Sequence, residues 1–338
     1  MSRFESCLPL HFLVHGGLSS KPDATFSASF LKGSLASMNT ETNHISVCIC
    51  TYKRPEFLKR LIHDLISQET EGLFTYSIVV ADNDRLRSAE ALVTGFAAAS
   101  PVKIRYCVQP QQNIALTRNK AIENAEGNFI AFIDDDEFPA KDWLITLYKT
   151  CKQYQVDGVL GPVKPYFETP PPEWIIKSNL CERATYPTGL VIDWRKGRTG
   201  NVLLKSSLFT SGELPFRPEF RNGEDQDFFQ RKIEAGHVFV WCNEAVAHEF
   251  VPPIRWNRKF LLRRALLRGS IEPKTVGFGP ASLFRSLAAV LAYSVAMPFA
   301  FLMGQHRFMP MLISTCDHLG KLLAFVGVNP VKEQYVTE

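Results

Sequence analysis

Four consecutive acidic residues directly follow an apolar run in the segment NFIAFIDDDEFPAKDW, residues 128–143. They are Asp134, Asp135, Asp136 and Glu137. Two like charges about 4 Å apart repel by roughly 4 kcal/mol at an effective dielectric of about 20, so a buried block of this kind needs a compensating cation. Carboxylate oxygens are the ligands that Mg²⁺ and Mn²⁺ prefer, which favours a divalent cation that arrives with a diphosphate. The alternative is a solvated acidic turn that caps the following helix.

Two further polar clusters follow predicted strands. The first contains Thr51, Tyr52, Lys53 and Arg54, and the second contains Asp82, Asn83 and Asp84. The carboxyl ends of parallel strands meet at one edge of a sheet, and ligands bind there in open α/β proteins. We therefore expect these two clusters and the acidic block to form one site.

The segment RNGEDQDFFQRKIEAGH, residues 221–237, predicts a helix that Asn222 caps, with Asp225 at its third position. On residue types alone, Glu224 and Asp225 are better explained as acids that complement the helix dipole. His248 follows a predicted strand and is, by itself, better explained as a structural histidine. The functional alternatives are a general base at Asp225 and a metal ligand at His248.

Several function classes lose support from the sequence. The motifs GxGxxG, GKS/GKT, HExxH and GxSxG are absent, which disfavours dinucleotide oxidoreductases, P-loop NTPases, zincins and α/β-hydrolases. The net charge of +4 is too small to indicate nucleic acid as a partner. The 8 cysteines include no CxxC pair, and we expect reduced, buried thiols in a cytosolic domain.

The hydrophobic pattern predicts an α/β fold with a mostly parallel sheet flanked by helices. Apolar runs typical of buried strands lie at 45–50, 76–82, 103–109, 128–134, 157–163, 201–206 and 237–243. Helices are expected from Pro55, over 114–126, from Trp143 and over 223–235. The proline-rich segment 164–200 is expected to be irregular.

The chain is expected to have three parts, with a disordered extension at 1–42, a catalytic domain at 43–250 and membrane-associated helices at 251–338. The segment Ser286–Gln305 contains no formally charged residue, and a helix of that length is about 30 Å long, enough to cross a bilayer. The following apolar stretch, 308–328, carries Asp317 and Lys321 and suits an interfacial or re-entrant helix.

A basic set precedes these segments. It consists of Arg255, Arg258, Lys259, Arg263, Arg264 and Arg268. Interleaved with apolar residues, it predicts an amphipathic helix on anionic lipid. The excess of Arg and Lys also predicts that the catalytic domain lies on the cytoplasmic face of the inner, or plasma, membrane.

The ordered motifs CTYKRPEFL, VVADND, TRN, FIDDDE and GEDQDFF resemble family 2 glycosyltransferases of the GT-A fold, and among them the ExoM-like enzymes of exopolysaccharide assembly. The match covers roughly residues 44–250. The resemblance implies transfer of a sugar, with inversion, from a UDP-sugar, UDP-glucose first, to a lipid-linked saccharide in polysaccharide or glycolipid assembly. It also implies Mg²⁺ or Mn²⁺ as cofactor, a membrane surface as partner and no nucleic acid.

The resemblance implies a nucleotide-binding set. Thr51 and Tyr52 would line the uracil pocket, and Asp82 would bond the uracil N3–H. Arg118 would face the nucleotide or its phosphates, and Arg54 belongs to the same set. Thr117 stands where the wider family often has alanine, which departs from the family pattern.

The remaining implied roles belong to the acids and the histidine. Asp134 and Asp135 would hold ribose or metal-bound water, and Asp136 matches the metal-binding acid of the DxD motif. His248 matches a histidine that touches the metal or the diphosphate. Asp225 matches the catalytic base.

Glu224 is the next candidate for the base after Asp225. Two other classes remain open at this point. One is a metal-dependent nuclease or nucleotidyltransferase, which also gathers carboxylates around Mg²⁺, and the other is an inactive membrane scaffold.

Overall fold

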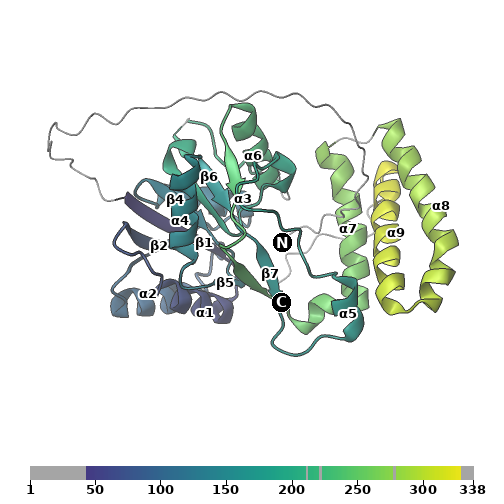
Figure 1. Ribbon diagram of the computed structural model, residues 1–338, viewed down its shortest axis with the longest axis horizontal. Helices are drawn as coiled ribbons and strands as arrows, with labels where there is room; N and C mark the ends of the chain where they lie inside the picture. The colour runs from purple at the N-terminus through teal and green to yellow at the C-terminus, as the bar shows by residue number, and fades with distance from the viewer. Residues whose placement is uncertain (1–42, 211, 221–222, 277–278, 329–338) are drawn as a thin grey trace, which may run out of the picture.

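The structure of the protein is a computed structural model that describes residues 43–210, 212–220, 223–276 and 279–328 (Figure 1). The extension predicted at 1–42 and the predicted cap Asn222 lie outside the described residues. An α/β catalytic part and a group of three long helices lie beside each other along the longest axis of the molecule.

A seven-stranded sheet forms the centre of the catalytic part. Its order is β3-β2-β1-β4-β8-β6-β9. The strands are β1 (Asn43–Thr51), β2 (Phe74–Asp82), β3 (Lys103–Val108), β4 (Phe129–Phe132), β6 (Gly158–Leu160), β8 (Val202–Lys205) and β9 (Phe239–Trp241). Among the strands described for this sheet, only β8 runs antiparallel to its neighbours, β4 and β6. The predicted α/β class with a mostly parallel sheet is therefore confirmed.

Helices cover both faces of this sheet, which is why its strands read as nearly continuous apolar runs. They are α1 (Pro55–Leu65), α2 (Glu90–Ala99), α3 (Ile114–Glu123), α4 (Trp143–Tyr154) and α6 (Glu224–Glu234). One hydrophobic core holds Leu58 of α1 and Trp143 of α4. The other holds Ala115 of α3 and Phe228 of α6. Pro55 stands in the first turn of α1, as predicted.

A small second sheet adjoins the end of the first. Its order is β5-β10-β7, formed by β5 (Glu137–Pro139), β10 (Ala247–Phe250) and β7 (Val163–Tyr166). The strand predicted over 157–163 is thus divided between β6 and β7, in different sheets. The segment expected to be irregular contains α5 (Glu173–Ser178) and a 3₁₀ turn, η1 (Trp194–Lys196), and another 3₁₀ turn, η2 (Ser206–Phe209), follows β8.

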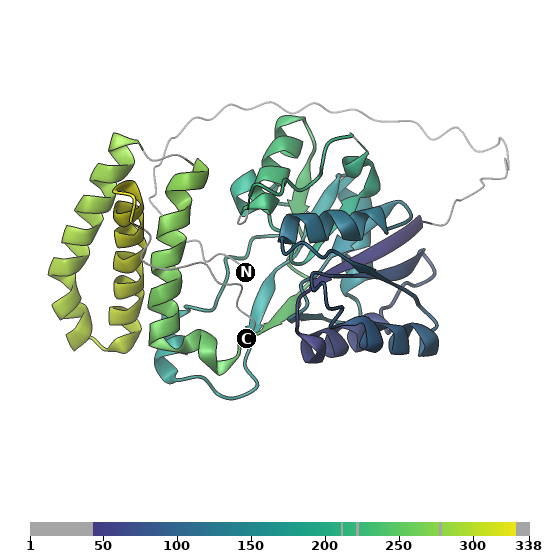
Figure 2. The same ribbon diagram turned by 180° about the vertical axis from the view of Figure 1, so that it is seen from behind.

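The C-terminal part consists of a 3₁₀ turn, η3 (Pro253–Trp256), and the helices α7 (Arg258–Val276), α8 (Pro280–Leu302) and α9 (Gln305–Phe325). Helix α9 packs against both α7 and α8, and α5 packs against α9. The α7–α9 contact is close, since a Cβ on Gly269 would lie 2.0 Å from the carbonyl oxygen of Asp317. Figure 2 shows the same order from behind, with α8 farthest from the catalytic part.

Candidate active site

The acidic block forms the turn between β4 and β5. The backbone N–H of Glu137 donates to the carbonyl oxygen of Asp134 at 3.0 Å and closes this turn. The exposed fractions of Asp135, Asp136 and Glu137 are 5%, 6% and 1%. The alternative of a solvated acidic turn is therefore excluded, and helix α4 begins after Asp142, outside the block.

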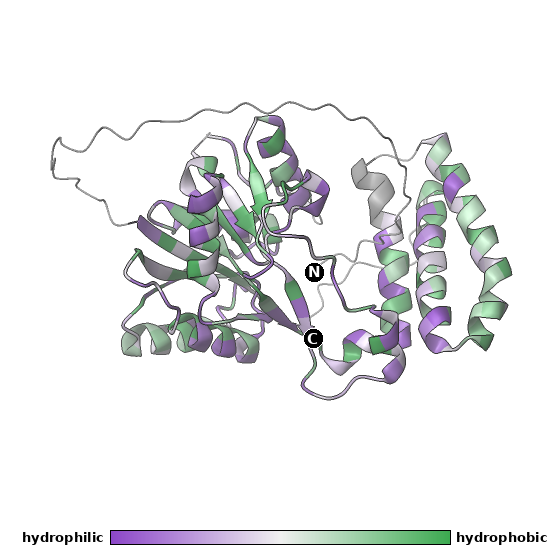
Figure 3. Cartoon of the chain, viewed as in Figure 1, coloured by the Kyte–Doolittle hydropathy of each residue, from purple (hydrophilic) through white to green (hydrophobic). Residues whose placement is uncertain are grey.

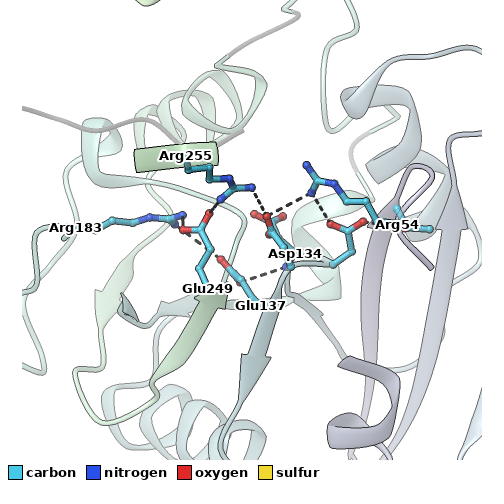
Figure 4. A network of polar contacts seen from close by, with 9 residues as sticks. Arg54, Asp134, Glu137, Arg183, Glu249 and Arg255 are labelled. Atoms are coloured by element: carbon cyan, nitrogen blue, oxygen red, sulfur yellow. Dashed lines mark hydrogen bonds and ion pairs between the residues drawn. The ribbon is translucent and has the colours of Figure 1, made fainter. Parts of the chain in front are cut away.

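Two arginines compensate the charge of the central aspartates (Figure 4). Arg54, in the loop after β1, donates from Nη1 to Oδ1 of Asp135 at 3.1 Å and to Oδ2 of Asp136 at 3.4 Å. Arg255, in η3, donates from Nη2 to Oδ2 of Asp136 at 2.6 Å and from Nη1 to Oε1 of Glu249 at 2.6 Å. These two guanidinium groups thus offset the repulsion between the adjacent carboxylates of the acidic block.

A third arginine, Arg183, lies near Glu137, the last acid of the block. Arg183 forms an ion pair with Glu249, and its Nη1 lies 3.9 Å from Oε1 of Glu137. Glu137 accepts a hydrogen bond at Oε2 from the backbone N–H of Asp134 at 3.3 Å, whereas Oε1 is buried without a hydrogen-bond partner. A Cβ on Gly200 would lie 2.9 Å from both Oδ2 of Asp134 and Oε1 of Glu137. Gly200 therefore leaves room for two carboxylates to approach each other.

The three buried acids have different protonation tendencies. Burial raises the pKa of Asp135 to about 6, and the neighbouring Asp136 adds to this while Arg54 opposes it. Burial acts in the same direction on Asp136, but Arg255 and Arg54 outweigh it and hold the pKa of Asp136 below its usual value. Burial and the charge of Asp134 raise the pKa of Glu137. Asp136 is therefore the buried acid that Arg255 and Arg54 keep ionised.

The other two polar clusters lie beside the block, as predicted. Thr51 donates from Oγ1 to Oδ2 of Asp135 at 2.8 Å, because β1 and β4 are adjacent strands. Thr51 is also paired in register with Asp82 of β2. Tyr52 follows, half-buried, with the Lys53 ammonium 5.2 Å from the centre of its ring.

Asp82 lies beneath this edge of the sheet. It is fully buried, and its carboxylate accepts hydrogen bonds from the backbone N–H groups of Asp84 and Ala89, each at 2.9 Å, and from the Tyr106 hydroxyl at 2.8 Å. These donors fix the loop that follows β2. In this geometry the carboxylate of Asp82 positions the loop, and its bond to the uracil N3–H stays a prediction.

Arg118 of α3 connects the acidic block to the start of α6. It is 8% exposed and forms an ion pair with Glu224, which is 6% exposed. Burial lowers the pKa of Arg118, but the charges of Glu224 and Asp134 outweigh this and raise it. The guanidinium carbon lies 5.6 Å from the centre of the Phe216 ring. Arg118 is thus permanently charged, and Glu224 is engaged as its partner.

Asp225 differs from its neighbour Glu224. It is the second residue of α6, after the cap Gly223, whose φ is +93°. Its side chain is half-buried, and Oδ1 accepts a hydrogen bond from the backbone N–H of Gln226 at 2.8 Å. The position predicted for Asp225 was one residue farther along the helix. Of the two acids, Asp225 is the one open to a reacting group.

His248 does not join the acidic block. Its ring stacks on Phe138 with 5.2 Å between ring centres and 21° between ring planes. Successive strand residues point to opposite faces, and the next residue, Glu249, faces the arginines. Burial and Lys164 lower the pKa of His248. No group of three His, Cys, Asp or Glu side chains arranged for a metal occurs in the described part of the chain. His248 thus lies away from the carboxylates of the block, and its expected contact with a metal or diphosphate stays a prediction.

The basic set predicted to lie on lipid partly turns inward. Arg255 pairs with Asp136, and Arg268 donates from Nε to Oδ1 of Asp317 at 2.7 Å. Arg264 is half-buried, and burial together with Arg255 lowers its pKa to about 10. The expectation that this set as a whole forms a lipid-facing surface is corrected, because these three arginines face protein.

Comparisons with known proteins identify the family of this chain. The model of the family described as Glycosyl transferase family 2 matches residues 46–209. The succinoglycan biosynthesis protein ExoM of Rhizobium meliloti (strain 1021) is 34% identical over 314 residues, which cover 88% of this chain and 97% of ExoM. The chain belongs to glycosyltransferase family 2. The predicted resemblance to ExoM-like glycosyltransferases is confirmed, and the nuclease, nucleotidyltransferase and inactive-scaffold alternatives fall away.

One further relative in sequence and one solved structure are also similar to this glycosyltransferase. The hyaluronan synthase of Pasteurella multocida is 23% identical over 248 residues, 63% of this chain and 25% of that protein. The solved structure of S. aureus TarS 1-349 in complex with UDP-GlcNAc has a TM-score of 0.50 and 15% identity, and the match covers 84% of this chain and 92% of that chain. At this identity the match concerns the fold alone, and it agrees with the predicted GT-A fold.

Proposed function

We propose that this glycosyltransferase transfers a sugar from a UDP-sugar, with UDP-glucose as the first donor to test, to a lipid-linked saccharide, with inversion at the anomeric carbon. The observation that carries the proposal is the buried carboxylate of Asp136 beyond the carboxyl end of β4, which accepts hydrogen bonds from the guanidinium groups of Arg54 and Arg255. Ligands bind at this edge in open α/β sheets. The biosynthetic role of the relative ExoM supports an acceptor that belongs to a growing polysaccharide.

A divalent cation, Mg²⁺ or Mn²⁺, fits the chemistry of the block. Asp136 would hold the cation, and Asp134 and Asp135 would supply neighbouring oxygen ligands. In this structure the guanidinium group of Arg255 supplies positive charge at the carboxylate of Asp136. The buried Oε1 of Glu137, which has no hydrogen-bond partner although Arg183 lies 3.9 Å away, supports a further cation at the block. When bound, such an ion stabilises the negative charge of a departing diphosphate.

The chain's own residues would bind and orient the donor. Tyr52, half-buried beside Thr51, would line the uracil pocket, and Asp82 would hold the loop after β2 in place. Arg118 and Arg54 are permanently charged and would attract the phosphates. Asp135, fixed by Thr51, would accept from the ribose hydroxyls or a bound water.

Asp225 would take the proton from the acceptor hydroxyl as that oxygen attacks the anomeric carbon on the face opposite the departing UDP. Its neighbour Glu224 would fix Arg118 and the start of α6. A general base at the beginning of a helix is held in place by the backbone, so the direction of its carboxylate is defined.

Membrane association would bring the enzyme to a lipid-linked acceptor. Helix α8 is long and apolar enough to cross a bilayer, and 11% of its most apolar window is buried inside the protein. A core helix of a soluble protein would be mostly buried instead. We propose that α8 holds the enzyme on the cytoplasmic face of the inner membrane.

The proposed function is tested by incubating the purified full-length chain with a panel of UDP-sugars, Mn²⁺ and a membrane lipid extract as the acceptor source. One UDP-sugar should release UDP faster than the others, and EDTA should suppress the release. Asp225→Asn serves as the control for contaminating hydrolases, since it should lose the activity while still binding UDP. Release that is equal for all sugars, or unchanged in Asp225→Asn, contradicts the proposal.

A further inference from the structure

We propose that helix α8 lies in the plane of a single membrane leaflet, with its outer face in the lipid, and does not cross the bilayer. This inference rests on the membrane association proposed above and specifies its geometry. It also differs from the prediction made from the sequence, where the length and composition of Ser286–Gln305 indicated a helix that crosses the membrane.

The face of α8 directed away from the protein is apolar over its whole length. At intervals of three or four residues it presents Phe284, Leu287, Leu291, Val295, Phe299 and Leu302, which are each 47% to 83% exposed. The opposite face packs on α9, where Ser286 and Ala300 are 2% and 4% exposed. Figure 3 shows apolar colouring along α8, whereas α9 and α7 are mixed. A continuous exposed apolar face of this size is typical of an interaction with lipid or another protein.

The position of α8 in the molecule defines the direction of this face. Helix α9 contacts both α7 and α8, so the three helices form a layer in the order α7, α9, α8. The layer is attached to the catalytic part through Arg255 of η3 and through α5, which packs on α9. In Figures 1 and 2, α8 is outermost and all three helices run across the longest axis of the molecule.

A spanning α8 conflicts with this arrangement. Its axis would be the membrane normal, and α7 and α9, which run beside it, would lie at the same depth. The exposed side chains of Arg258, Lys259 and Arg263 on α7 would then enter the membrane, at up to about 2.5–3.5 kcal/mol for each charge. The polar catalytic part lies beside the helices and not beyond their ends, so it too would have to enter the membrane.

An in-plane α8 removes the conflict. The membrane normal then runs along the longest axis of the molecule, and α8 alone enters the lipid by roughly 5–10 Å. Packed helices lie about 8–10 Å apart, so α7 stays roughly 16–20 Å behind α8, outside the hydrocarbon. The catalytic part, which contains the acidic block, lies on the side of this layer away from α8, where water-soluble nucleotide sugars would have access.

Positive charge at both ends of α8 indicates that its apolar face contacts a single anionic leaflet. Arg285 near its start and Arg307, just beyond its end, are both exposed. In the in-plane orientation both guanidinium groups reach the same layer of anionic headgroups. In a spanning orientation one of them would have to lie on the far side of the membrane, against the usual bias of positive charge to one side.

Depth measurements on the full-length chain test the orientation. Spin labels are attached to Phe284→Cys, Leu291→Cys and Leu302→Cys, and the protein is bound to vesicles of phosphatidylglycerol and phosphatidylethanolamine. Leu86→Cys, at 73% exposure on the catalytic part, is the matched control, and the unsubstituted chain corrects for labelling of native cysteines. Collisions with oxygen and with a water-soluble relaxant give the depth of each label.

The proposal predicts that the α8 labels lie at similar, shallow depths while the label at residue 86 stays in water. A label at 291 near the bilayer centre, with the label at 302 about 16 Å closer to a surface, overturns the in-plane orientation, since 11 residues of helix rise by that length. In sealed vesicles, Arg285→Cys and Arg307→Cys should both react with an impermeant thiol reagent added outside. Protection of one of the two until lysis also overturns it. A chain that does not bind the vesicles contradicts the membrane association itself.

Discussion

Arg255 donates a hydrogen bond of 2.6 Å to Asp136 across 119 residues of sequence. The bond joins η3, which leads into the three C-terminal helices, to the end of β4. Because the acidic block is buried, this guanidinium stabilises a carboxylate that water cannot solvate. The catalytic site and the proposed membrane-binding helices are therefore parts of one structure.

Arg255→Met should destabilise the protein by about 3–5 kcal/mol, because it leaves the buried carboxylate of Asp136 without its closest cation. Urea unfolding measures the effect. Mn²⁺ should restore part of the loss, since a bound cation would replace the missing charge. Arg263→Met, an exposed arginine on α7, is the control and should change stability by less than about 0.5 kcal/mol. Equal stability of the two variants would show that the Arg255–Asp136 bond is unimportant.

The two acids at the start of α6 should have separable roles. Asp225→Asn should lower turnover by about 10²–10⁴-fold with little change in stability, because it removes a general base and no buried partner. Glu224→Gln should instead lower stability, because Arg118 would stay buried without its carboxylate. Initial rates of UDP release and unfolding midpoints distinguish the two. If Asp225→Asn retained a near-normal rate, the base would lie elsewhere.

The strands of the large sheet were predictable because burial on both faces requires continuous apolar runs, as in residues 45–50. Helix α2 was missed because EALVTGFAAA, with Gly95 in its interior, shows little apolar periodicity. The second sheet was missed because its strands have only 3 or 4 residues, and it is their pairing with distant segments that defines them.

The site was predictable to the extent that it lies at the ends of the strands of one sheet. Thr51 and the acidic block meet there because β1 and β4 are adjacent. The contribution of Arg255, Arg183 and Glu249 was not predictable, since β10 and η3 bring distant segments to the block. The basic run around Arg255 suggested lipid because sequence alone does not show which arginines find buried acids.

Gly200→Ala tests whether the close approach of two carboxylates matters. The added Cβ would lie 2.9 Å from oxygens of both Asp134 and Glu137, so one of them must move. Overpacking of this kind costs about 1–3 kcal/mol, and UDP binding in Mn²⁺ should weaken as well. Gly95→Ala, which points into open space on α2, is the control and should be neutral or slightly stabilising. Unchanged stability and UDP affinity in Gly200→Ala would contradict the arrangement of the block.

The double variant Leu291→Asp/Val295→Asp should move the protein from membranes into the soluble fraction. Each carboxylate on the exposed face of α8 opposes insertion by up to about 2.5–3.5 kcal/mol, depending on depth. Fractionation followed by a high-salt wash measures the effect. Leu86→Asp, at an equally exposed leucine of the catalytic part, should remain on the membrane with the unsubstituted chain. If the double variant also stays there, α8 is not the membrane contact.

Binding of a nucleotide diphosphate together with a divalent cation at the acidic block is tested most directly by calorimetry with UDP. UDP is titrated into the full-length chain and into Asp136→Asn, each in EDTA and in Mn²⁺. Mn²⁺ should increase the affinity of the unsubstituted chain for UDP at least tenfold, or by about 1.4 kcal/mol, and should have little effect on Asp136→Asn. Equal affinity of the unsubstituted chain for UDP with and without metal would contradict metal-dependent binding at the block.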